Sequence, residues 1–294
     1  MLTLTFLGVG SAYAKRNFQS NALIEAWSAR PDRQAAPDDT LLVDFGTTGP
    51  VALHHLKRVP GFSHLDRDGT VYYPAIGRIF ITHQHSDHIG GLEELAGTNM
   101  HYCADAASGR GFKPQIIGAG EVLANLWDHS LKGGLGTLTG RHATMADYFE
   151  ALALHPAGQG EPDRFTMLDR YEFTMFPTHH IQVQREYDWP SHGLLIADRT
   201  TRDTILYSGD TRFDPAGLGR MMGAAKLSFH EVQLEDQTEP VHATLSQLRT
   251  LPESVRKKTI LYHYGDTWDG GAYDFVADEF AGFARPQYRY TLFD

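Results

Sequence analysis

The chain has 294 residues, a formal net charge of −10 at pH 7 and a single cysteine, Cys103. One cysteine excludes an internal disulfide and a cysteine-based zinc finger, and the acidic balance argues against a nucleic-acid partner, which is held largely through Lys and Arg. The apolar runs are strand-sized and the N-terminus lacks a signal-peptide pattern, so we predict a cytoplasmic protein with no membrane partner.

Short apolar runs broken by glycine predict strands in both halves of the chain, with helices between them. Strands are expected at 2–9, 22–27, 41–44, 78–82, 171–176, 193–197, 204–207, 226–229 and 259–262. Helices are expected at 50–57, from 92 onward, at 145–154 and at 242–251. The less regular interval at about 97–170 is interpreted as an elaboration on the core. Since no linker divides the chain, we expect one α/β domain over residues 1–294.

Residues 83–88 read His-Gln-His-Ser-Asp-His and stand between an expected buried strand and an expected helix. In an extended segment, residues two apart share a face, so His83 and His85 can point at one spot. Where the chain turns into the helix, Asp87 and His88 can reach a second spot beside it. Imidazole and carboxylate are ligands that suit zinc and similar ions. The alternative explanation is a polar surface turn.

This segment resembles the His-x-His-x-Asp-His signature of the metallo-β-lactamase superfamily, which implies a four-layer αββα sandwich of the α/β class. In that superfamily a histidine, an aspartate and a last histidine follow later strands as further ligands. The sequence offers a match at each place: His179 or His180, then Asp210 in Ser-Gly-Asp-Thr, then His263. We favour His180 over His179 because an apolar residue, Ile181, follows it directly, as in related hydrolases.

The resemblance implies two divalent metal ions at one site, zinc foremost, with manganese or iron as alternatives. One ion would be held by His83, His85 and His180, and the other by Asp87, His88 and His263, with Asp210 between them. Two ions would lower the pKa of a shared water enough for hydroxide to exist near neutral pH. Asp87 would also orient this nucleophile.

Two further residues indicate a branch of the superfamily. Glu231, which ends an expected strand, and His242, in Val-His-Ala-Thr, resemble motifs of the ribonuclease Z group and its phosphodiesterase relatives. There the histidine reaches the scissile phosphate and the glutamate orients it. A carboxylate-supported imidazole can protonate a leaving oxygen. The alternative is that His242 caps a helix and that Glu231 is a solvated acid.

Three other segments bear on this assignment. Residues 8–12, Gly-Val-Gly-Ser-Ala, are similar to a loop of the same group, whose backbone N–H groups could meet an anion. The interval from His180 to Asp210 is too short for the basic arm with which ribonuclease Z grips tRNA. Residues 91–95 and the insertion after them resemble the cyclic nucleotide phosphodiesterases of the group, which include the anti-Pycsar enzymes that destroy cyclic nucleotide defence signals.

We therefore predict a metal-binding hydrolase, a phosphodiesterase that converts 3′,5′-cyclic nucleotides to linear monophosphates by a metal-activated hydroxide. Its catalytic residues would be Asp87, Glu231 and His242. The alternatives are a ribonuclease Z-like nuclease and another metallo-β-lactamase-fold hydrolase of small esters. The substrate would be a small-molecule phosphodiester, and the resemblance implies a homodimer. Tyr264 and Trp268 could stack on a nucleobase or pack in the core, and the sequence leaves both open.

Overall fold

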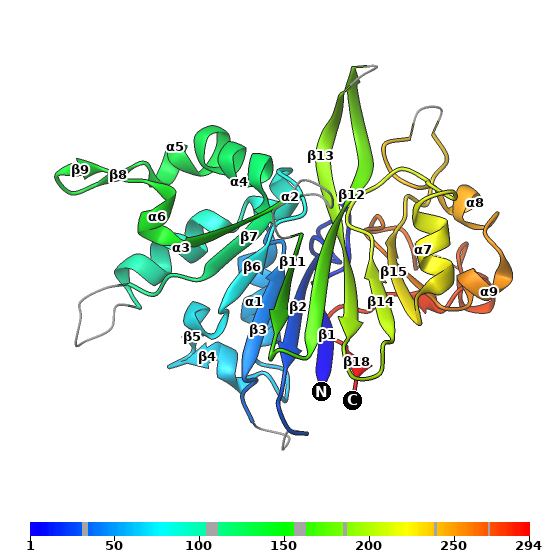
Figure 1. The fold of residues 1–294 in the computed structure, drawn as a ribbon, viewed down its shortest axis with the longest axis horizontal. Coiled ribbons are helices and arrows are strands. Elements are labelled where there is room, and N and C mark those ends of the chain that lie inside the picture. The colour runs from blue at the N-terminus through cyan, green and yellow to red at the C-terminus, as the bar shows by residue number, and fades with distance from the viewer. Residues whose placement is uncertain (31–34, 104–110, 156–162, 185–186, 238–239, 270) are drawn as a thin grey trace. The chain divides into compact units, whose positions relative to one another are not determined.

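The structure is a computed structural model, and it describes residues 1–30, 35–103, 111–155, 163–184, 187–237, 240–269 and 271–294. The chain divides into two compact units (Figure 1). Unit 1 consists of Met1–Gly8, Asn21–Leu154 and Gln287–Asp294, and unit 2 of Val9–Ser20 and His155–Pro286. The single domain expected over 1–294 stays a prediction.

Unit 1 is built on a seven-stranded mixed sheet with the order β10-β7-β6-β3-β2-β1-β18. Its sheet strands are β1 (Leu2–Gly8), β2 (Asn21–Ala26), β3 (Asp39–Val43), β6 (Arg78–Phe80), β7 (Gln115–Ala119), β10 (Glu150–Leu154) and β18 (Arg289–Phe293). Two small hairpins pair β4 (Asp66–Arg67) with β5 (Thr70–Val71) and β8 (Thr137–Leu138) with β9 (Arg141–His142). Every residue of β1 and β2 is buried, which is typical of central strands.

The helices of unit 1 include α1, which presents its buried residues Ala52, Leu53 and Leu56 on one face and contacts β1. The α-helices are α1 (Gly49–Leu56), α2 (Ser86–Ile89), α3 (Leu92–His101), α4 (Gly120–Leu126), α5 (Lys132–Leu135) and α6 (Met145–Tyr148). Two 3₁₀ turns, η1 (Ser63–Leu65) and η2 (Tyr73–Ala75), and one π-helical turn, η3 (Trp127–Leu131), complete the unit.

Unit 2 is built on a second seven-stranded sheet with the order β11-β12-β13-β14-β15-β16-β17. Its strands are β11 (Arg164–Met167), β12 (Tyr171–Gln184), β13 (Tyr187–Asp198), β14 (Thr204–Tyr207), β15 (Leu227–Glu231), β16 (Thr259–Tyr262) and β17 (Gly282–Phe283). Its helices are α7 (Leu218–Ala224), α8 (Leu245–Leu248), α9 (Glu253–Arg256) and α10 (Val276–Glu279). The strands from β11 to β14 pair antiparallel, and those from β14 to β17 pair parallel. The carboxyl ends of β14, β15 and β16 therefore meet at one edge of this sheet.

The expected strands all form, but the expected helix over 145–154 is wrong. Only α6 (Met145–Tyr148) is helical, and Glu150–Leu154 forms β10, which pairs parallel with β7. Alanine, leucine and glutamate favour a helix in isolation, and here the pairing with β7 overrides that propensity. The last expected helix, over 242–251, is shorter than predicted, since α8 covers Leu245–Leu248.

The interval expected as an elaboration, 97–170, contributes strands to both sheets. β7 and β10 belong to the sheet of unit 1, and β11 belongs to that of unit 2. Between β7 and β10 lie four short helical segments and a small hairpin. Residues 104–110 and 156–162 of the interval lie outside the described residues. No helix in the described part of the chain is long and apolar enough to span a membrane.

We expect Gly193→Ala to destabilise the protein by about 1–3 kcal/mol, as overpacking of a dense core does. A Cβ at Gly193 in β13 would lie 2.4 Å from the ring of Phe176 and 2.6 Å from the carbonyl oxygen of Ser208. Gly223→Ala in α7 is the control, because a Cβ there meets nothing within 4 Å and alanine favours a helix. Thermal unfolding of both variants checks this. A Gly193→Ala protein as stable as Gly223→Ala would contradict the packing described.

Candidate metal centre

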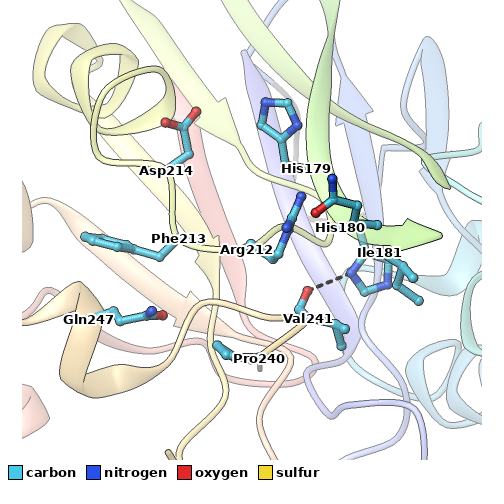
Figure 2. Close-up of a pocket in the computed structure, with 10 residues that line it drawn as sticks. His179, His180, Ile181, Arg212, Phe213, Asp214, Pro240, Val241 and Gln247 are labelled. Atoms are coloured by element: carbon cyan, nitrogen blue, oxygen red, sulfur yellow. Dashed lines mark hydrogen bonds between the residues drawn. The ribbon is translucent and has the colours of Figure 1, made fainter. Parts of the chain in front are cut away.

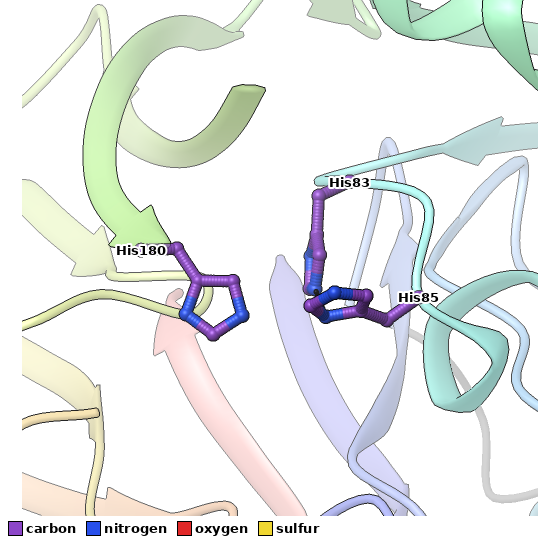
Figure 3. Close-up of side chains that lie close together, drawn as sticks. All are labelled: His83, His85 and His180. Atoms are coloured by element: carbon purple, nitrogen blue, oxygen red, sulfur yellow. Dashed lines mark hydrogen bonds between the residues drawn. The ribbon is translucent and has the colours of Figure 1, made fainter. Parts of the chain in front are cut away.

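In unit 1, the signature histidines follow the end of a parallel strand. β3 and β6 pair parallel, so the residues that come after them emerge at the same edge of the sheet. His83 follows β6, and its Nε2 lies 2.9 Å from Nδ1 of His85. Figure 3 shows the two rings directed at the same place, as alternation along an extended segment predicts. A pair of imidazole nitrogens this close can be directed at one ion.

Asp87 and His88 lie in α2, and both are buried. Nε2 of His88 is 3.2 Å from a carboxylate oxygen of Asp87. The other ring nitrogen, Nδ1, lies 2.7 Å from Oδ2 of Asp44. An imidazole that donates one N–H to a carboxylate keeps its other nitrogen fixed in orientation, which is the usual support of a metal-binding histidine.

The sequence analysis missed Asp44, although its position directly after an apolar strand was a signal. Its carboxylate also accepts hydrogen bonds from the backbone N–H and the hydroxyl of Thr82, at 2.8 and 2.7 Å. Thr82 Oγ1 in turn lies 3.0 Å from Nδ1 of His83. Asp44 is fully buried, and burial raises the pKa of its carboxyl against the opposing effect of His88. One carboxylate therefore orients residues on both sides of the signature.

In unit 2, three chemistry-bearing residues stand at the carboxyl ends of parallel strands. Asp210 follows β14, Glu231 ends β15 and His263 follows β16. Nε2 of His263 lies 3.4 Å from Oδ2 of Asp210. The backbone of Asp210 is fixed by two hydroxyl groups, since Thr178 and Ser191 each donate to its carbonyl oxygen at 2.9 Å. The predicted convergence of these strand ends is found within this unit.

The structure distinguishes the two adjacent histidines of β12. His180 is buried, while His179 is exposed. The pairing register of β12 with β13 shifts between His179 and Gln182, and such bulges redirect side chains beside functional sites. Nδ1 of His180 donates to the carbonyl oxygen of Val241 at 2.9 Å. Burial lowers the pKa of His180 to about 4, so the ring is neutral near pH 7, the form in which a histidine binds metal.

Glu231 joins the two loops that carry Asp210 and His242. Its Oε1 accepts from the backbone N–H of Thr211 at 3.1 Å and from that of Ala243 at 3.2 Å. The same oxygen is 3.2 Å from Nδ1 of His242. Glu231 is fully buried, so it is not the solvated acid of the alternative explanation. Nδ1 of His242 also lies 3.9 Å from Oδ2 of Asp210.

The glycine-rich loop within Val9–Ser20 supports His263 rather than an anion. His263 has a left-handed backbone conformation, with φ of 64°, and its N–H donates to the carbonyl oxygen of Val9 at 2.7 Å. The N–H groups of Val9, Gly10 and Ser11 donate to protein carbonyl oxygens. For these three N–H groups the expected contact with an anion is wrong, because each is used to hold the loop and the histidine beside it.

The two aromatic residues after His263 pack together. Tyr264 is fully buried, its hydroxyl donates to the carbonyl oxygen of Ala284, and its ring centroid is 5.4 Å from that of Trp268. Both rings also contact Phe283. Of the two possibilities that the sequence left open, core packing is the one that the structure supports for Tyr264.

Together these donors fit a divalent metal ion by their chemistry. In unit 2, one ligand atom of His180 and one of Asp210 lie within 4.8 Å of each other, and a ring nitrogen of His242, the proposed catalytic residue, lies equally near to both. In unit 1, ring nitrogens of His83 and His85 lie 2.9 Å apart, and a ring nitrogen of His88 lies 3.2 Å from the carboxylate of Asp87. Imidazole and carboxylate groups are the ligand set of zinc and its neighbours, and His88 and His180 are each oriented by a further hydrogen bond.

A family model described as "Anti-Pycsar protein Apyc1" matches residues 2–290. The chain belongs to the anti-Pycsar protein Apyc1 family. It is 34% identical over 268 residues to the Apyc1 protein of Paenibacillus sp. (strain J14), covering 90% of each chain. It is 33% identical over 267 residues to the Apyc1 protein of Bacillus phage vB_BsuM-Goe3, covering 90% of this chain and 89% of the relative.

Solved structures show the same fold. The metallo-β-lactamase fold protein YhfI from Bacillus subtilis matches with a TM-score of 0.66 at 16% identity, covering 98% of each chain. Zn²⁺-bound PqqB from Methylobacterium extorquens matches with a TM-score of 0.65 at 12% identity, covering 99% of this chain and 100% of that one. The predicted metallo-β-lactamase fold of the α/β class is confirmed, and the chain is a metal-dependent hydrolase of that superfamily.

We expect Asp44→Asn to lower the affinity for zinc by about 10- to 100-fold, as the loss of an outer hydrogen-bond partner typically does. Asparagine tolerates the left-handed conformation of Asp44, whose φ is 60°, so the variant removes the charge and keeps the turn. Asp38→Asn, at an exposed carboxylate that accepts from Ser28, is the control. Zinc titration against a competing chelator measures both, and equal affinities would show that Asp44 does not support the ligands.

Proposed function

We propose that the chain is a dinuclear-metal phosphodiesterase that hydrolyses 3′,5′-cyclic nucleotides to linear monophosphates. Two observations support this. The chain belongs to the anti-Pycsar family, and anti-Pycsar enzymes destroy cyclic nucleotide signals. The imidazole of His242 is hydrogen-bonded to the carboxylate of Glu231 and lies next to Asp210, a proposed metal ligand. This second observation carries the proposal.

The proposed ligands follow the order of the motifs along the chain. His83, His85 and His180 would hold one ion, Asp87, His88 and His263 the other, and Asp210 would lie between the two. Zinc is the ion that suits this set best, and manganese and iron accept the same ligands. When bound, two such ions supply Lewis-acid activation of a water molecule and of the phosphoryl group.

The residues of the chain account for the proton transfers of the reaction. Hydrolysis forms one P–O bond from water and breaks one of the two ester P–O bonds of the cyclic phosphate. The attacking oxygen acts as hydroxide, having released one proton to solvent, and the carboxylate of Asp87 accepts a hydrogen bond from it and orients it. The leaving ribose oxygen needs a proton, which His242 donates from Nε2 while Nδ1 remains bonded to Glu231. Glu231 stabilises the protonated imidazole and holds it in one orientation.

Incubation of the metal-loaded protein with cAMP, cGMP, cCMP and cUMP tests the proposed reaction. We expect conversion to linear monophosphates, and we expect its loss in His85→Ala, because this change removes one imidazole of the His83–His85 pair. Product analysis by chromatography with mass detection measures both.

The wild-type protein must be shown to be folded and loaded with two ions, by its unfolding temperature and its metal content. Absence of turnover in such a protein would sink the cyclic nucleotide assignment. RNA ends and small esters would then be the substrates to examine, since they belong to the two alternative hydrolase classes.

We expect Glu231→Gln to lower kcat by roughly 10²-fold, within the range that general acid catalysis contributes. The amide oxygen of glutamine can still accept from Thr211 and Ala243, so the loops stay joined, and only the negative charge that stabilises protonated His242 is removed. The kcat, KM and unfolding temperature are measured together. A kcat equal to that of the wild type would show that Glu231 holds the loops without supporting the acid.

The homodimer and the cytoplasmic location inferred from the sequence stay predictions. The substrate class is a small phosphodiester in this proposal, and a nucleic-acid partner is not part of it.

A further inference from the structure

A hollow of about 670 Å³ opens beside His180, entirely within unit 2 (Figure 2). Its walls include His180 and Val241, which stand next to the proposed catalytic His242, and also Arg212, Phe213 and Gln247. A volume of this size lies within the range of small-molecule sites, which run from about 300 to 1,000 Å³. In Figure 2, Phe213 and Gln247 stand on the opposite side of the hollow from His180.

Phe213 offers a face on which a planar group can stack. Its side chain is half-buried and forms part of the wall of the hollow. No aromatic ring among the described residues is stacked against it, in contrast to Tyr264 and Trp268, which pack on one another and on Phe283. Stacking of a nucleobase on an aromatic ring is favourable for every base, because each base has a π-face.

Gln247 presents a defined hydrogen-bonding group to the same hollow. Its Oε1 accepts from the backbone N–H of Thr244 at 3.0 Å, as part of the capping box of α8. The amide orientation is therefore fixed, and the two N–H donors are the part of the side chain that remains for a ligand. A ring nitrogen or a carbonyl oxygen of a base is the kind of acceptor that these donors would meet.

The wall of the hollow carries one cationic and one acidic side chain. Arg212 supplies a permanent cation that can meet a phosphate. The nearby carboxylate of Asp214 is used by the chain itself, since it accepts from the backbone N–H groups of Gly217 and Leu218 at the start of α7.

We propose that this hollow binds the nucleobase end of the substrate, with the base stacked on Phe213 and hydrogen-bonded by Gln247. The cyclic phosphate would then lie toward His180, which lines the hollow and whose ring centroid is 4.9 Å from that of His242. This assignment rests on the proposed function for the reaction, and it adds the residues that hold the part of the substrate that does not react.

The test compares Phe213→Ala with Phe213→Tyr, which keeps the ring, and with Tyr13→Ala. Tyr13 tests the competing location for the base, because it is 90% exposed and lines a second hollow, of about 240 Å³, together with His242 and His263. Calorimetry measures the binding of AMP, GMP, CMP and UMP to the metal-loaded protein. Steady-state kinetics measure KM for the 3′,5′-cyclic nucleotides and for 1-deoxyribose 3′,5′-cyclic phosphate, which has no base.

We expect Phe213→Ala to weaken nucleotide binding and to raise KM for cyclic nucleotides by roughly 10-fold or more, as the loss of one stacked base does. The abasic substrate should be turned over as by the wild type, and Phe213→Tyr should behave as the wild type does. Gln247→Glu keeps the acceptor for Thr244 and replaces the two donors, so we expect binding to weaken by about 5- to 10-fold with no fall in unfolding temperature.

The outcomes separate this inference from the proposed function. Cyclic nucleotide turnover that is unchanged by Phe213→Ala, or that is lost only in Tyr13→Ala, overturns the assignment of the hollow and leaves the reaction standing. Binding of nucleoside monophosphates that depends on Phe213, without any turnover of cyclic nucleotides, supports the hollow and overturns the reaction. A wild-type protein that neither binds nor hydrolyses a nucleotide overturns both.

Discussion

The carboxylate of Glu231 is the single group on which the chemistry of unit 2 depends. One of its oxygens accepts from Thr211, from Ala243 and from the ring of His242, so the loop after β14 and the loop before α8 are both fixed by it. Its position at the end of β15, between two parallel neighbours, is what brings those loops within reach. A buried charge is costly unless it is hydrogen-bonded, and here each bond also positions a residue of the proposed site.

Hydrogen bonds from outside the ligand set hold histidines in place in each unit. His88 is held by Asp44, His180 by the carbonyl oxygen of Val241, and His263 through its backbone by Val9. An anionic partner makes an imidazole a stronger base than a carbonyl partner does. The ring of His88, bonded to a carboxylate, is therefore the more basic ligand, and the ring of His180, bonded to a carbonyl oxygen, is the less basic one.

The sequence predicted those parts of the fold and site that follow from the alternation of side chains along a strand and from the residues that stand at strand ends. His83 and His85 share a face because an extended chain alternates, and Asp210, Glu231 and His263 meet because parallel strands end at one edge. It could not predict Asp44, because an acid after a strand is common and its partner His88 is distant in sequence. It failed at residues 150–154, where pairing with β7 decides between helix and strand. The expectation of an anion at the N–H groups of residues 9–11 was also wrong, because these groups donate to carbonyl oxygens elsewhere in the chain.

The course of the chain through unit 1 has a consequence for synthesis on the ribosome. A nascent chain that has reached Leu154 contains every strand of the first sheet except β18, which pairs with β1 and follows all the strands of unit 2 in the sequence. Until then one edge of β1, a strand buried along its whole length in the finished protein, has no neighbour to pair with. An unpaired apolar edge is a template for association with other chains, so the period of greatest aggregation risk should last until β18 has been synthesised.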